Sequence, residues 1–124
     1  MTRVLVVDDD AAVRSVVAKL LEDEGYVVDT AADGAQALHR AREAPPTAIL
    51  LDLMMPVLDG WGFVDACRQQ SICLGVPVVA MSAAQGLQEI TRRLKQIGVR
   101  VVLAKPLDVV ALMALMEHYA PLAA

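Results

Sequence analysis

Residues 47–60 constrain the fold most, because they place a short apolar segment directly before a single carboxylate and two helix-breaking signals. The segment 48–51 predicts a strand buried on both faces, which is typical of a parallel sheet. Asp52 follows it, and Pro56 and the pair Asp59-Gly60 then delay the next helix. An aspartate at the end of a buried strand is either a helix cap or a functional group, and the rest of the chain decides between these interpretations.

The same alternation of strand and helix continues along the whole chain. Strands are predicted over residues 3–7, 26–30, 48–51, 76–81 and 99–103, and apolar residues at helical spacing follow each of them. Aspartates stand where helices are expected to begin and glycines where they are expected to end: Asp10, Asp33, Asp59 and Asp108, then Gly25 and Gly98. The pattern predicts an α/β fold with a five-stranded parallel sheet of order 2-1-3-4-5 and helices on both faces. This is the flavodoxin-like, doubly wound (βα)5 arrangement.

Length and charge exclude several classes of protein. A chain of 124 residues suits one domain, which we expect over residues 1–120, with residues 121–124 a tail or the start of a linker. The net charge of −4 argues against direct binding of nucleic acid, which needs a basic surface. No apolar run approaches the ~20 residues of a membrane span. A strand that begins at residue 3 leaves no room for a signal peptide, so we expect a cytoplasmic protein.

Cys67 and Cys73 are the two cysteines of the chain. In a reducing compartment we expect free thiols in the core or a loop. Two cysteines without nearby histidines make a poor zinc site.

Polar residues stand at the predicted carboxyl ends of four strands: Asp8 and Asp9, Asp52, Ser82, and Lys105. The carboxyl ends of parallel strands share one edge of the sheet, so these side chains are expected to converge. Clustered carboxylates repel one another unless a cation lies among them, and oxygen ligands suit Mg²⁺. The lysine and the hydroxyl suit the oxygens of a phosphoryl group. Asp52 is the carboxylate best placed to act as a nucleophile and form an aspartyl phosphate.

Each of these residues alone has a simpler explanation as a cap, a turn residue or a solvated charge. Their specificity lies in their joint occurrence and order. The segments Val6–Asp10, Leu51–Gly60, Met81–Ala83 and Lys105–Leu107 together closely resemble the response regulator receiver domain of two-component signalling. The resemblance extends over essentially the whole chain.

The resemblance implies that Asp52 is the phospho-acceptor, charged by the phosphohistidine of a sensor histidine kinase or a phosphotransfer protein of a phosphorelay. It also implies a Mg²⁺ site, which Mn²⁺ can also occupy. Asp9 and Asp52 would bind the ion directly, the backbone carbonyl of Met54 would be a third ligand, and Asp8 would act through a bound water.

The resemblance further implies that Ser82 and Lys105 each bind a phosphoryl oxygen and that the Lys105–Pro106 peptide is cis. The chain would then be a signalling switch and not an enzyme with a small-molecule substrate. Its own chemistry would be limited to accepting the phosphoryl group and hydrolysing it slowly.

Two features depart from the family pattern. Val102 stands three residues before the lysine, where the family often has an aromatic residue that changes rotamer. The signal would therefore have to pass through Ser82 and the loop and helix after it. The last helix has a predicted core stripe of Val109, Leu112, Met113 and Met116, but it also carries Val110, Ala111, Ala114 and Leu115 elsewhere on its surface. A helix that is apolar nearly all round is buried or meets a partner, so we expect a homodimer contact there.

Two other classes share parts of this pattern. A flavodoxin-like redox protein would need a phosphate cradle after the first strand, where Asp8, Asp9 and Asp10 have the wrong sign of charge. A phosphatase of the haloacid dehalogenase type would need a second aspartate two residues after the first, where this chain has Met54. The sequence leaves open whether the chain is a stand-alone receiver or part of a larger regulator or hybrid kinase.

Overall fold

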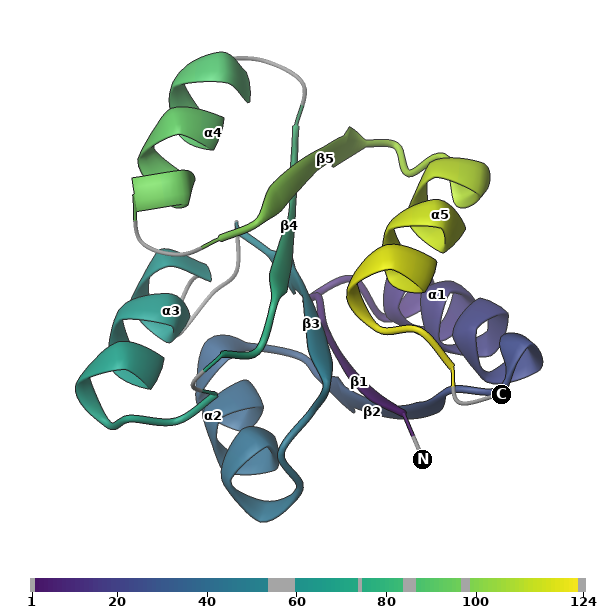
Figure 1. Cartoon of the computed structure of the whole chain (residues 1–124), viewed down its shortest axis with the longest axis horizontal. Helices are drawn as coiled ribbons and strands as arrows, with labels where there is room; N and C mark the ends of the chain where they lie inside the picture. Colours follow the sequence, from purple (N-terminus) through teal and green to yellow (C-terminus); the bar gives the residue numbers. More distant parts are fainter. Residues whose placement is uncertain (1, 54–59, 74, 84–86, 97–98, 123–124) are drawn as a thin grey trace.

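The computed structural model describes residues 2–53, 60–73, 75–83, 87–96 and 99–122 (Figure 1). Strands and helices alternate in it: β1 (Arg3–Val7), α1 (Ala11–Glu24), β2 (Val27–Ala31), α2 (Gly34–Glu43), β3 (Ala48–Asp52), α3 (Gly60–Gln69), β4 (Val78–Ala83), α4 (Leu87–Gln96), β5 (Val101–Lys105) and α5 (Val109–Tyr119). The strands form one parallel sheet of order β2-β1-β3-β4-β5. The predicted fold class and strand order are confirmed.

Side chains of each central strand alternate between two apolar layers, as the two-residue period of a strand requires. On β3, Ile49 and Leu51 belong to one buried cluster, while Ala48 and Leu50 belong to the other. Every residue of β3 is buried. This two-sided burial explains why the segment is apolar throughout and does not alternate with polar residues.

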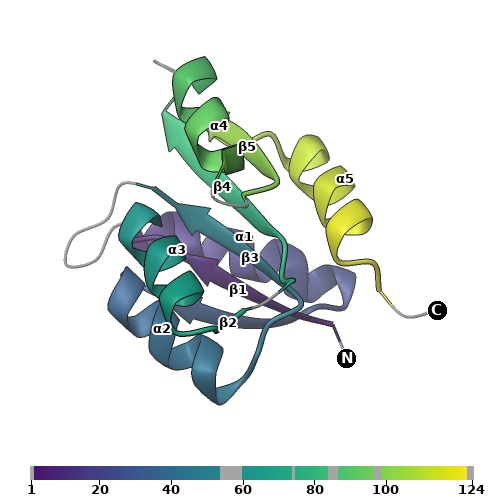
Figure 2. The same ribbon diagram turned by 60° about the vertical axis from the view of Figure 1, so that its left-hand side comes forward.

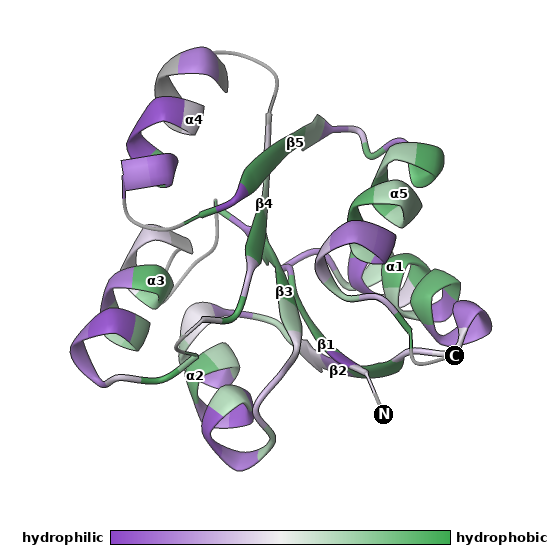
Figure 3. Ribbon diagram, in the orientation of Figure 1, coloured by the Kyte–Doolittle hydropathy of each residue, from purple (hydrophilic) through white to green (hydrophobic). Residues whose placement is uncertain are grey.

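The helices divide between the two faces of the sheet (Figures 1 and 2). Helices α2, α3 and α4 cover one face, where Phe63 and Leu94 are fully buried. Helices α1 and α5 cover the other face, where Leu21 and Met116 are fully buried. The hydropathy colouring shows hydrophobic central strands, mixed colours on α2 and α3, and a largely hydrophilic α4 (Figure 3). Helix α5, by contrast, is hydrophobic over most of its length.

Aspartate caps set the helix starts, as expected. Asp10 accepts hydrogen bonds from the amides of the first turn of α1, and Asp108 does the same for α5. Asp33 caps α2 by accepting from Gln36 N at 2.8 Å. Gly25 ends α1 in a left-handed conformation, φ 110°, that other residues rarely adopt. The predicted signals at Asp59 and Gly98 lie outside the described residues.

Strand boundaries and part of the expected core differ from the sequence-based expectation; for example, Val16, expected in the core stripe of the first helix, is 59% exposed. β4 begins after Pro77, because proline lacks the N–H group that a sheet ladder needs. β5 extends to Lys105, because its register pairs Ala104 with Ser82 and carries the backbone past the last apolar residue. Val109 was expected in the core stripe of the last helix, and this prediction is wrong: its side chain is 46% exposed. It is the first residue of α5 and lies beyond the part of the helix that packs on the sheet.

Within the described part of the chain, no helix is both long enough and apolar enough to cross a membrane.

Candidate functional site

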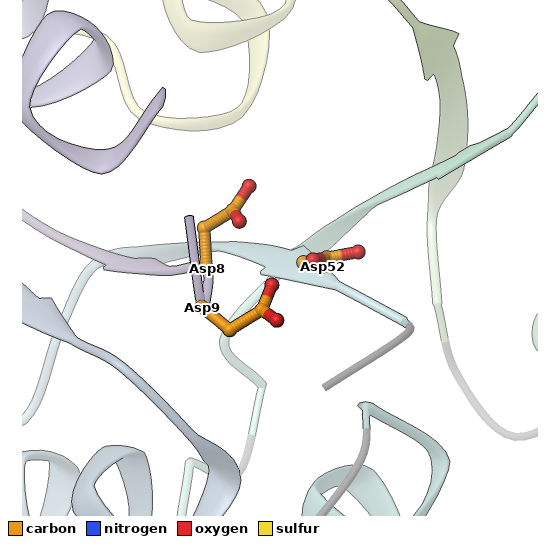
Figure 4. Close-up of side chains that lie close together, drawn as sticks. All are labelled: Asp8, Asp9 and Asp52. Carbon is orange, nitrogen blue, oxygen red and sulfur yellow. The ribbon is translucent and has the colours of Figure 1, made fainter. Parts of the chain in front are cut away.

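Three carboxylates converge at the carboxyl edge of the sheet. One carboxylate oxygen from each of Asp8, Asp9 and Asp52 lies within 4.8 Å of the other two. Asp8 and Asp52 are buried, whereas Asp9 is exposed. Figure 4 shows the Asp9 side chain extending from the end of β1 towards Asp52, with Asp8 beside them. The predicted convergence of these three residues is confirmed.

Lys105 supplies the positive charge of this cluster. Its Nζ lies 3.1 Å from Asp8 Oδ2 and 3.4 Å from Asp52 Oδ2. The strand period explains the meeting, because Asp8, Asp52 and Lys105 continue the phases of Val6, Leu50 and Leu103, which face the same apolar layer. Burial opposes the charge of Lys105, but the hydrogen bond to Asp8 and the charges of Asp52 and Asp8 outweigh it. The pKa of Lys105 therefore lies above its ordinary value.

The side chain of Asp8 has no exposed surface, and hydrogen bonds from three residues fix the position of this aspartate. Its Oδ1 accepts a hydrogen bond from Asp10 N at 2.9 Å, and its Oδ2 faces the lysine. Arg14 Nη1 donates to the Asp8 backbone oxygen at 2.7 Å. Arg14 was not predicted as a site residue, although its position four residues after the cap Asp10 places it on the first turn of α1, next to the end of β1.

Ser82 lies on the neighbouring strand at the same edge of the sheet. It is buried, and in the register of the sheet it stands one residue beyond Met81, the partner of Asp52. The Lys105–Pro106 peptide is cis, as expected. Met54, the predicted carbonyl ligand, lies outside the described residues.

The cluster fits a hard divalent cation. Its donors are all carboxylate oxygens, which Mg²⁺ prefers, and they are close enough to share one ion. Lys105 pairs with Asp8 and Asp52, and a divalent cation among the three clustered carboxylates would further reduce their mutual repulsion. Asp8, Asp9 and Asp52 are therefore the residues that could hold a metal ion.

Val102 packs partly buried against the layer that α2, α3 and α4 cover. A side chain of this size and shape cannot perform an aromatic rotamer change. The loop that follows Ser82 begins with residues outside the described part, so the alternative route of the signal stays a prediction.

A doubly wound sheet with an acid cluster and a lysine at its carboxyl edge defines the receiver class of signalling domain. The chain belongs to the response regulator receiver domain family, whose model matches residues 4–117. Receiver domains of this family are signalling switches of two-component systems and not ordinary enzymes.

Individual relatives agree with this assignment. The chain is 42% identical over 112 residues to the transcriptional regulatory protein PrrA of Mycobacterium leprae. The match covers 90% of this chain and 47% of PrrA, so the chain spans about half the length of that relative.

Solved structures show the same architecture. The chemotaxis response regulator CheY4 of Vibrio cholerae is 35% identical with a TM-score of 0.87, and the match covers 96% of this chain and 98% of that one. The receiver domain of the sensor histidine kinase PA1611 from Pseudomonas aeruginosa is 32% identical with a TM-score of 0.83, covering 95% and 96% of the two chains. The PA1611 domain was solved with a magnesium ion coordinated in its active-site cleft.

Proposed function

We propose that Asp52 accepts a phosphoryl group from the phosphohistidine of a sensor histidine kinase or a phosphotransfer protein. The observation that carries this proposal is the position of its carboxylate, 3.4 Å from Lys105 Nζ and clustered with Asp8 and Asp9. An Asp52 oxygen attacks phosphorus, the N–P bond of the phosphohistidine breaks, and the imidazole keeps the electron pair and takes up a proton. The product is an aspartyl phosphate.

The surrounding residues are assigned to charge balance and orientation. Lys105 pairs with one phosphoryl oxygen, and the Ser82 hydroxyl donates to another. Asp9 and Asp52 would hold Mg²⁺ or Mn²⁺ directly, Asp8 would do so through a water, and the Met54 carbonyl would complete the protein ligands. A bound divalent cation supplies positive charge beside the phosphoryl oxygens. Slow hydrolysis of the aspartyl phosphate by water returns the chain to its resting state.

We assign the receiver unit to residues 1–120, with residues 121–124 a tail or the start of a linker. The family match over residues 4–117 supports this extent. The relatives include a transcriptional regulator and the receiver of a sensor kinase, so both contexts are consistent with the chain. Cytoplasmic location and the absence of direct nucleic-acid binding by these residues stay predictions.

The proposed output is a phosphorylation-dependent change in a partner-binding surface, which includes a homodimer contact on α5. The exposed apolar side chains of Val110 on α5 and Val16 on α1 support this contact, with exposed fractions of 79% and 59%. Leu115, expected to be part of the outward surface, packs partly buried against the core. The contact surface therefore combines the start of α5 with the adjoining part of α1.

The phospho-acceptor is tested by incubating the protein with acetyl phosphate and Mg²⁺ and measuring its intact mass. We expect one added phosphoryl group in the wild type and none in Asp52→Asn or in the presence of a chelator. Asp23→Asn is the matched control, because Asp23 is an exposed carboxylate on α1 that pairs with Lys19 at 2.7 Å. Undiminished labelling of Asp52→Asn would refute the assignment.

A further inference from the structure

The two thiols of the chain lie beside the same cavity in the reduced protein. Cys67 is buried on α3, and Cys73 lies partly exposed in the connection between α3 and β4. Cys73 packs against the buried cluster that contains Cys67. The backbone holds both ends of this connection, because Ile72 N donates to the Cys67 oxygen at 2.9 Å and Val76 N donates to the Cys73 oxygen at 3.1 Å. The two thiols are thus held beside the same cavity before any reaction.

The thiol pair lies at the opposite edge of the sheet from the carboxylates. Both cysteines line a cavity of about 280 Å³ together with Ile49 and Val78, which stand near the starts of β3 and β4. Asp52, by contrast, is the last residue of β3. The thiol site is therefore separate from the proposed phosphorylation site.

Arginine residues lie near the thiol site. Arg68 and Arg100 line the cavity, and the charge of Arg42 acts on Cys67. Guanidinium groups favour a thiolate and oppose the entry of a metal cation. The arrangement therefore favours redox chemistry of the thiols over metal binding.

The two thiols differ in their readiness to lose a proton. The interaction with the Cys67 thiol lowers the pKa of Cys73 below its ordinary value, although burial acts in the opposite direction. The interaction with Cys73, together with burial, raises the pKa of Cys67. Cys73 is also the more exposed of the two thiols, so both its exposure and the direction of its pKa favour it as the nucleophile.

We propose that Cys67 and Cys73 form a redox-active dithiol, which a small hydroperoxide converts into an intramolecular disulfide. The Cys73 thiolate attacks one peroxide oxygen, the O–O bond breaks, and the alkoxide leaves and takes up a proton as an alcohol, or as water from hydrogen peroxide. Cys67 Sγ then attacks the sulfur of the Cys73 sulfenic acid. The S–O bond breaks, and the hydroxyl group leaves with the Cys67 proton as water. The two sulfurs lose two electrons in total, and the peroxide gains them.

The disulfide would tie the last turn of α3 to the segment that leads into β4. Helix α3 begins at Gly60, on the carboxyl side of the sheet, and Cys67 lies near its other end. Oxidation would therefore fix one end of the helix that follows the phospho-acceptor strand.

The test treats the full reduced chain with hydrogen peroxide, blocks the remaining thiols with iodoacetamide, and maps peptides by mass spectrometry. We expect loss of both free thiols, a Cys67–Cys73 crosslink, and a chain that stays monomeric on a non-reducing gel. Reduction with dithiothreitol should restore both thiols. Two alkylated cysteines after peroxide, or crosslinks between chains alone, would overturn the proposal.

Variants separate the roles of the two thiols. In Cys67→Ser, oxidation should stop at a Cys73 sulfenic acid that dimedone traps, whereas Cys73→Ser should react several-fold more slowly. The arginine variants test the charge near the thiols. Arg100→Gln should oxidise more slowly than the wild type. Arg40→Gln is the control, because Arg40 is an exposed arginine on α2 that does not line the cavity, and its replacement should leave the rate unchanged. Faster oxidation of Cys67 than of Cys73, or protection of both thiols by one equivalent of Zn²⁺, would contradict the proposal. Mapping of the wild type retains its force if the Cys67→Ser variant does not fold.

Discussion

Asp8 shows how one residue depends on distant parts of the chain. Its carboxylate has no exposed surface, and its principal counter-charge is Lys105, 97 residues away in the sequence. Burying a charge is costly unless it is paired and hydrogen-bonded, and here the lysine and the Asp10 amide meet that requirement. Removal of the lysine leaves this carboxylate buried without its ion-pair partner.

Lys105→Met should therefore destabilise the protein in the absence of divalent cations. Because Lys105 is itself 30% exposed, we expect a loss of roughly 1–3 kcal/mol in the free energy of unfolding, below the full cost of breaking a buried pair. Mg²⁺ should then stabilise the variant more than the wild type, because the lysine no longer neutralises the carboxylates that would bind the ion. Urea denaturation with Mg²⁺ and with a chelator measures both effects.

Lys95→Met is the control for this prediction, since it removes an exposed lysine from α4. It should leave the free energy of unfolding and the effect of Mg²⁺ near the wild-type values. Equal Mg²⁺ effects in Lys105→Met and the wild type would contradict the expected competition between the lysine and the cation.

Among the elements, α5 is the one whose role changes most between sequence and structure. Leu112 and Met116 form its buried stripe as expected, while Val109 and Val110 remain exposed at its start. An apolar groove of about 320 Å³ runs between this end of α5 and α1, with Val16 and Leu107 among its lining residues. A stable interface buries about 800 Å² per partner. The contact proposed here centres on the exposed side chains of Val16, Val109 and Val110, so we expect a weak contact between copies.

Val110→Asp should weaken self-association of the phosphorylated protein. A carboxylate in the centre of an apolar contact loses its water on association, so we expect the dimer to dissociate at concentrations where the wild type is partly dimeric. Sedimentation velocity of acetyl phosphate-treated protein measures the change. Ala35→Asp adds the same charge at an exposed position of α2, on the other face of the sheet, and should leave association unaltered. A wild type that stays monomeric at high concentration would exclude this contact.

At the scale of the whole molecule, proton binding makes the free energy of unfolding depend on pH in the alkaline range. Tyr26 is buried in the apolar cluster that α1 and α5 cover. This burial, with the charges of Glu117 and Glu24, raises the pKa of Tyr26 above its ordinary value. Between the unfolded pKa near ~10 and the higher folded pKa, the native chain keeps a proton that the unfolded chain has lost. The native state then binds more protons, so stability must fall as the pH rises through this interval.

Tyr26→Phe should reduce this alkaline loss of stability. We expect a smaller decrease in the free energy of unfolding between pH 8 and pH ~11 than in the wild type, because the ionisable group is gone. The raised pKa of Lys105 contributes in the same direction and remains in the variant. Urea titrations at both pH values measure the difference. An identical decrease in Tyr26→Phe and the wild type would contradict the role of Tyr26.

The sequence predicts the sheet and the acid cluster well because both depend on local patterns. An apolar strand followed by Asp52 places the carboxylate at the sheet edge regardless of finer geometry. The position of Val109 and the placement of Cys67 and Cys73 beside one cavity depend instead on where helix ends lie against the sheet. Arg14 was missed for a different reason: its position on the first turn of α1 could be predicted, but its contact is with a backbone oxygen and not with a side chain.

The bond between Asp8 and Lys105 also has a consequence for synthesis on the ribosome. The strands that carry the acidic trio, β1 and β3, are complete early, whereas the neutralising lysine is the last residue of the last strand. The Asp8–Lys105 ion pair can form only after β5 has been synthesised. Until then, any approach of the strand ends that brings the three carboxylates together lacks the positive charge of this lysine.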